Sequence, residues 1–181
     1  MKPRTLVLVL AACTLAVPVF ADNPSIPYAG QQTRTIKALS DEDIAALRKG
    51  EGMGMAKAAE LNGYPGPMHV LTLAKELKLT ESQLRQVRAI FDRMSAAAKL
   101  LGAELIEHER VLDQLFATSE IRPDRLAVET AAIGELEGRL RSVHLAAHLE
   151  TRALLNPNQI AHYQQLRGYS DPAAPEHHHH G

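Results

Sequence analysis

Apolar side chains recur along the middle of the chain in alternating steps of three and four residues. Steps of this kind place the side chains on one face of a helix and form a heptad seam. No proline interrupts the stretch from Thr80 to Ala117, which predicts a single helix about 60 Å long. Its seam comprises Leu84, Val87, Phe91, Met94, Ala98, Leu101, Leu105, His108, Leu112 and Leu115.

A second seam follows a predicted turn at residues 118–122, and Pro123 suits the first position of the returning helix. Folding the two helices antiparallel about the turn brings Leu101 opposite Leu140. Carboxylates occupy two positions of the second seam, which makes it the weaker of the two. It comprises Leu126, Glu129, Ile133, Leu136, Leu140, Val143, Ala147, Glu150 and Leu154.

Shorter elements are expected on both sides of this hairpin. Ser40 is a suitable N-cap, and acidic residues follow it in the first turn of a helix. Gly168 is a suitable residue to follow the end of the last helix. Residues 22–40 lack an apolar period and are expected to form a flexible tether. The expected short helices span residues 41–49, 55–61, 67–77 and 157–166.

The composition favours helices packed on helices. Aromatic residues make up only 4% of the chain and tryptophan is absent, so the core has to be aliphatic and rich in alanine. Two helices joined by one narrow seam bury too little surface to be stable alone. The short helices can cover part of the hairpin, and a second protomer can cover the remainder.

Two helix starts share one pattern. Thr80 precedes Gln83, and Asn156 precedes Gln159, so each N-cap side chain stands three residues before a glutamine that can form a reciprocal capping box. A leucine stands before each cap. On these two motifs and the hairpin between them, residues 41–169 resemble the LTXXQ family of periplasmic proteins, which includes Spy and CpxP chaperones and ZraP- and CnrX-type metal proteins.

The resemblance implies a Spy/CpxP-like fold: an all-α hairpin that dimerises into a shallow cradle whose concave side holds clients. The second motif departs from the family pattern, since Asn156 replaces threonine, but asparagine can cap a helix in the same way.

The first residues predict export. Lys2 and Arg4 precede a short apolar stretch, and Val19-Phe20-Ala21 suits cleavage of a signal peptide at residues 1–21. The product would be soluble and periplasmic. The alternative is a lipoprotein anchored through Cys13, because Leu10-Ala11-Ala12-Cys13 also resembles a lipobox. Without the signal peptide the chain is slightly acidic, which gives no reason to expect nucleic acid as a partner.

Four side chains form a candidate metal site at the open end of the hairpin. His144 and His148 are four residues apart, so both imidazoles project from one helix face. Asp92 is expected at their level on the opposite helix, and His69 on a short helix can close over them. The alternative is that the pair is half-exposed, or is hydrogen-bonded to a neighbouring carboxylate.

The resemblance supports such a site only in part. CnrX-type sensors bind metal at this end through histidines, a carboxylate and a methionine. Here His69 is followed by Leu73 where those sensors repeat a histidine, and Ala147 and Thr151 occupy their later ligand register. The candidate metals are zinc, nickel, cobalt and copper.

Other residues are considered as metal ligands outside this site. His108 lies in the seam, where a hydrogen-bonded or register-fixing histidine is the expected role. Met53, Met55 and Met68 could hold monovalent copper or could simply pack against neighbours. The His-rich tail, residues 170–181, is expected to be disordered, and it is either a native metal-scavenging tail or a truncated tag. Its candidate ligands are His177, His178, His179 and His180.

No enzyme is expected, because no serine stands in a nucleophile-elbow setting and no phosphate-binding glycine loop is present. The family resemblance implies a role in envelope stress or heavy-metal response, as an ATP-independent chaperone, a metal-binding sensor, or both. The expected partners are a second copy, unfolded envelope proteins, and a membrane-bound sensor or anti-sigma protein. The alternative is a metal-storage or structural protein with no client or signalling role.

Overall fold

The computed structural model describes residues 27–169. The predicted signal peptide, Cys13 and the histidine tail therefore lie outside the described residues. Within them the fold is helical, and the only β-type pairing is an isolated bridge between Ile36 and Leu39. The elements are η1 (Gln31–Thr33), α1 (Asp41–Lys49), α2 (Lys57–Glu60), α3 (Pro67–Thr72), α4 (Glu81–Ala117), α5 (Pro123–Leu154) and α6 (Pro157–Leu166).

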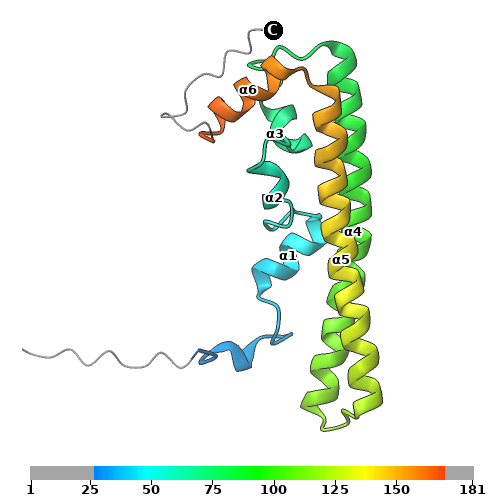
Figure 1. Cartoon of the computed structure of the whole chain (residues 1–181). Coiled ribbons are helices and arrows are strands. Elements are labelled where there is room, and N and C mark those ends of the chain that lie inside the picture. The colour runs from blue at the N-terminus through cyan, green and yellow to red at the C-terminus, as the bar shows by residue number, and fades with distance from the viewer. Residues whose placement is uncertain (1–26, 170–181) are drawn as a thin grey trace, which may run out of the picture.

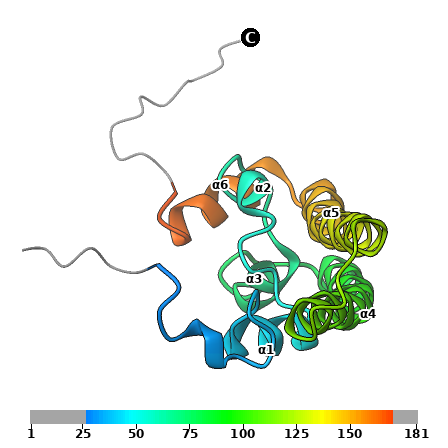
Figure 2. The same cartoon turned by 90° about the horizontal axis from the view of Figure 1, so that it is seen from below.

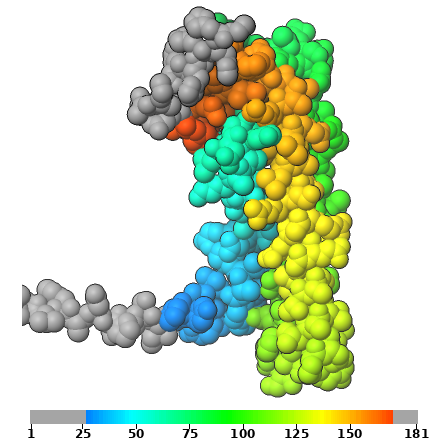
Figure 3. Space-filling view, in the orientation of Figure 1, coloured from blue at the N-terminus to red at the C-terminus, as the bar shows by residue number. Residues whose placement is uncertain are grey.

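The predicted antiparallel hairpin is confirmed, and α4 and α5 form it (Figure 1). Residues 36–79, here called the N-terminal layer, lie along one side of this hairpin and include α1, α2 and α3. Seen from below, α4 and α5 stand side by side, and the short helices, including α6, lie together on one side of this pair (Figure 2). The tip of the hairpin projects beyond the layer (Figure 3). No helix within residues 27–169 combines the length and apolar character needed to cross a membrane.

Capping side chains mark the starts of α1, α4 and α6. Ser40, Thr80 and Asn156 each accept a hydrogen bond from the backbone N–H three residues on, and the side chain at that position bonds back to the cap. These reciprocal bonds satisfy backbone donors that a helix start leaves free. α3 is shorter than predicted because residues 73–78 form turns, where Lys78 adopts a left-handed φ of 49°.

Two apolar clusters fill the space between hairpin and layer. At mid-length, Leu47 of α1 packs against buried leucines and isoleucine of both long helices, including Leu101 and Leu140. Near the open end, Val70 of the layer and Tyr163 of α6 pack with Val87 of α4. The layer therefore supplies the surface that the heptad seam alone lacked.

The seam is tight in the middle and open at its ends. Leu84 and Leu126, which were predicted as seam residues, are 40% and 39% exposed. Ile90, outside the predicted seam, is buried at 6% exposure. The helices thus present more than one face to neighbours, because the hairpin packs against the layer as well as against itself.

The region predicted as a tether is packed over its last part. Ile36 is only 3% exposed. Both the backbone N–H and the ammonium group of Lys37 lie 3.1 Å from the Asp113 carboxylate on α4. Sequence periodicity cannot predict this contact, because it consists of a single apolar residue and one ion pair.

Gly102 lets the layer approach α4 closely. A Cβ atom at this position would lie 2.5 Å from the carbonyl oxygen of Leu47, at the end of α1. Because that neighbour is backbone, it cannot turn aside as a side-chain end could. Gly134 lies exposed on α5, where an added Cβ would meet nothing within 4 Å.

The substitution Gly102→Ala should therefore destabilise the protein by about 1–3 kcal/mol, the usual cost of overpacking. Gly134→Ala is the matched control, and it should stabilise by about 0.5–1 kcal/mol because alanine favours helix. Urea unfolding followed by circular dichroism measures both changes. Equal stability of the two variants would contradict the close approach of α1 to α4.

Candidate functional site

The two motif glutamines meet in space. The amide nitrogen of Gln83 lies 2.9 Å from the side-chain oxygen of Gln159 and 2.8 Å from the carbonyl oxygen of Leu154. The amide nitrogen of Gln159 also reaches the carbonyl oxygen of Leu77, at 3.2 Å. Each glutamine keeps its own capping box at the same time. The starts of α4 and α6 and the end of α5 are thereby joined at one point.

His144 and His148 lie on α5 below this junction and are both buried, at 3% and 9% exposure. The alternative that they are half-exposed is therefore wrong. The N-terminal layer covers them: Gly52 lies over the His144 ring, and Gly66 lies so close to the His148 ring that a Cβ there would be 2.9 Å from it. The helix face that carries the pair points at the layer, and α4 packs on the adjacent face.

His148 is hydrogen-bonded to the layer. Its Nδ1 lies 2.7 Å from the carbonyl oxygen of Tyr64 and 3.7 Å from a carboxylate oxygen of Glu60. One turn along α5, Arg152 donates to the carbonyl oxygen of Gly63 and stacks over the Tyr64 ring, 4.6 Å from its centroid. Residues 60–66 are thus held to α5 by polar contacts.

Glu60 is the centre of this polar group. Its carboxylate accepts hydrogen bonds from the Tyr163 hydroxyl and, at 3.1 Å, from the Gly66 N–H. Arg167 lies 3.5 Å away and supplies the opposite charge. Burial and the neighbouring Glu60 raise the pKa of Tyr163 well above its ordinary value, so its hydroxyl remains a donor.

His144 differs from His148 in having a nitrogen without a partner. Its Nε2 is buried and forms no hydrogen bond. Burial lowers the pKa of His144, and His148 adds to this effect. The ring is therefore neutral near pH 7, and its Nε2 has no partner among the described residues.

The remaining predicted ligands are only partly brought together. His69 on α3 lies 3.4 Å from Arg167, and burial followed by that positive charge lowers its pKa. His69 thus borders the group around Glu60. Asp92 is exposed on α4, and the carboxylate beside the histidines is Glu60. Within residues 27–169, no three or more His, Cys, Asp or Glu side chains are already arranged to hold a metal ion.

His108 is satisfied within the hairpin, as expected. Its Nδ1 lies 2.8 Å from Glu129, a seam carboxylate that is only 4% exposed. Arg125 binds the other oxygen of Glu129, also at 2.8 Å. Glu129, which was expected to weaken the second seam, thus has a partner at each of its two oxygens.

The three methionines are spread over the layer. Met55 packs against the mid-hairpin cluster, while Met53 and Met68 are 43% and 51% exposed. The tail ligands His177 to His180 lie outside the described residues. Glu60 and Tyr163 are the site residues that sequence reasoning missed; a carboxylate just before the glycine- and proline-rich break is the one signal that Glu60 offered.

The family model described as "LTXXQ motif family protein" matches residues 67–167, more than half of the chain. The matched stretch contains both glutamine motifs, the hairpin and α6, and it confirms the resemblance stated from those motifs. No curated protein and no solved structure matches the chain.

The lowered pKa values of His144 and His69 predict acid sensitivity. Below a pH of about 6.5 these histidines bind protons in the unfolded chain but not in the folded one. Their contribution to the free energy of unfolding is therefore fully present above that pH and is lost as the pH decreases. Urea midpoints at pH 7.5 and 5.5, measured with a chelator present, should differ less in His144→Gln than in the parent. The exposed His162→Gln is the control; an unchanged pH dependence in His144→Gln would contradict the burial argument.

Proposed function

The chain belongs to the LTXXQ motif family, and on that premise we propose that it is a periplasmic, Spy/CpxP-like protein of envelope stress or heavy-metal response. Its first function is to bind a divalent transition metal between α5 and the N-terminal layer. The observation that carries this proposal is the buried, unpartnered Nε2 of His144, one helical turn from His148. The export pattern of residues 1–21 supports the compartment.

The chemistry of the two histidines suits metal ligation. Donation from His148 Nδ1–H to the Tyr64 carbonyl leaves Nε2 as the nitrogen with a free lone pair. Metal-binding histidines are commonly oriented by a carbonyl or carboxylate in this way. His144 is neutral because burial lowers its pKa, and a neutral imidazole binds metal without first losing a proton. The candidates remain zinc, nickel, cobalt and copper.

A third ligand has to come from the layer. Glu60 on α2 lies 3.7 Å from His148, and His69 on α3 borders the same group. Since no set of three ligands is assembled within the described residues, metal binding would require the layer to shift. That shift would couple metal occupancy to the position of α2 and α3, which a membrane-bound sensor or anti-sigma partner can read.

The metal proposal is tested with a chain that lacks residues 170–181, so that the tail cannot contribute. Titration with zinc, nickel, cobalt and cupric copper should give stoichiometric binding of at least one ion. Binding should disappear in His144→Ala/His148→Ala and persist in the exposed control His162→Ala. Unchanged affinity in the double variant would exclude the site.

A second candidate function is the holding of unfolded clients, and exposed apolar side chains on the hairpin favour it. Leu100 on α4 is 69% exposed, and Leu149 and Val128 on α5 are 58% and 57% exposed. Exposed apolar side chains mark a binding surface when they form a contiguous patch. A homodimer, as the family resemblance implies, would bring two such hairpins together.

The full chain should suppress the aggregation of a reduced model client without ATP. Leu100→Ser/Leu149→Ser should weaken that suppression, whereas Glu104→Gln, an exposed polar change on α4, should leave it intact. Light scattering measures the effect. Metal binding without any suppression by the parent would instead favour the storage alternative.

A further inference from the structure

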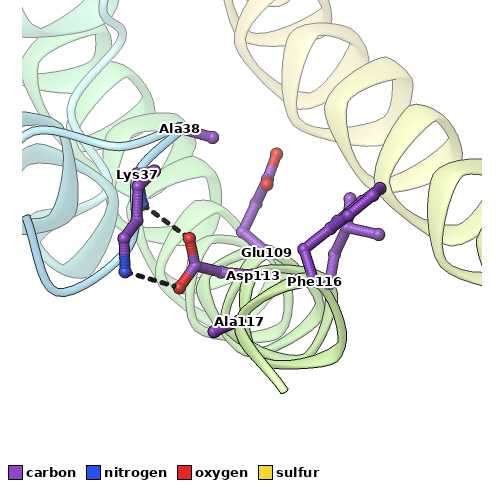
Figure 4. A pocket seen from close by; sticks show the side chains of 7 residues that line it. Lys37, Ala38, Glu109, Asp113, Phe116 and Ala117 are labelled. Atoms are coloured by element: carbon purple, nitrogen blue, oxygen red, sulfur yellow. Dashed lines mark hydrogen bonds and ion pairs between the residues drawn. The ribbon is translucent and has the colours of Figure 1, made fainter. Parts of the chain in front are cut away.

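A groove lies near the tip of the hairpin, between α4 and the first residues of the N-terminal layer. It has a volume of about 470 Å³. One end carries the Lys37–Asp113 ion pair, and the side chains of Glu109 and Phe116 stand on the other side of that pair (Figure 4). The lining residues are Lys37, Ala38, Glu109, Leu112, Asp113, Phe116 and Ala117.

The groove offers apolar surface that the protein itself leaves in water. Phe116 is 56% exposed, and Leu112 is only partly covered by the mid-hairpin cluster. Ala38 and Ala117 contribute small side chains to the lining. Pockets of about 300–1,000 Å³ hold a drug-sized ligand, so the groove has room for a large side chain.

The charges of the groove are not balanced. Lys37 already binds Asp113 through two contacts, each 3.1 Å long. Glu109 forms no hydrogen bond or ion pair with any side chain in residues 27–169, although it is half-buried. Burial raises the pKa of Glu109, and the nearby Glu137 and Asp113 add to this effect. A cation placed beside Glu109 would relieve this repulsion.

We propose that this groove binds an extended polypeptide segment in which a large apolar residue is followed closely by lysine or arginine. The apolar side chain would cover Phe116, and the cationic group would pair with Glu109. The proposal rests on the client-holding function and names the class of segment that such clients would present. It involves neither His144 nor His148, so the metal site can fail while the groove stands.

The test uses two labelled ten-residue peptides, one alternating leucine and lysine and the other alternating leucine and glutamate. Fluorescence anisotropy should show that the full-length protein prefers the lysine peptide. Glu109→Gln should weaken that binding by about threefold to fivefold, the usual range for partly exposed ion pairs. Phe116→Ser should weaken it by about tenfold, since an aromatic contact is lost.

Matched controls lie on the same helix outside the groove. Glu104→Gln removes the same charge as Glu109→Gln, and Leu84→Ser removes an apolar side chain that is 40% exposed on the same helix. Both should keep the parent affinity within about twofold, a difference below 0.5 kcal/mol. Equal weakening in the controls, equal affinity for the two peptides, or no peptide binding would overturn the proposal. So would a change from dimer to monomer in Phe116→Ser, because the groove would then be an interface between copies.

Aggregation assays on the same variants separate this proposal from the function on which it rests. If the parent and both groove variants protect a client equally, client holding stands and the groove proposal falls. If the parent protects no client but binds the lysine peptide through Glu109 and Phe116, the groove stands and the holding function falls.

Discussion

A hairpin of two long helices needs a third surface to pack against, and the rest of this structure depends on how the N-terminal layer supplies it. The layer meets the hairpin in two different ways. At mid-length the contact is apolar and close, because Gly102 allows the backbone of Leu47 to lie against α4. Nearer the open end Val70 of the layer still packs on Val87, and a polar contact is added, because His148 binds the Tyr64 carbonyl and lies beside Glu60. The close fit of the backbones fixes the apolar contact, whereas the polar contact depends on hydrogen bonds and on any ligand that binds there.

This difference connects the fold to the proposed function. Buried polar groups are costly unless they are hydrogen-bonded, and on α5 the layer satisfies His148 in this way. The Nε2 of His144 is buried without a partner, as is the Nε of Arg167. A metal ion would satisfy the His144 nitrogen and would draw on ligands from the layer. The hydrogen bonds between Gln83 and Gln159 would hold the open end together during the proposed shift of the layer.

Local sequence signals were sufficient for the long elements. Heptad spacing, the capping box at Thr80 and Pro123 at the first helical position predicted α4 and α5, because those signals act within one helix. The site was predicted less well. Asp92 was expected near His144 and His148, but it is exposed on α4, and the carboxylate beside His148 is Glu60. Both histidines pack against glycines of the layer. Which element covers a helix face is decided by distant residues, and a single sequence carries no periodic signal for it.

If a metal ion binds His144 and His148 as proposed, the segment that covers them should respond. Amide hydrogen exchange of residues 50–66 can be compared between metal-free and metal-saturated protein lacking residues 170–181. Protection should change in this segment while the middle of the hairpin, around Leu101 and Leu140, stays constant. Metal binding that leaves the exchange of residues 50–66 unaltered would contradict this expectation.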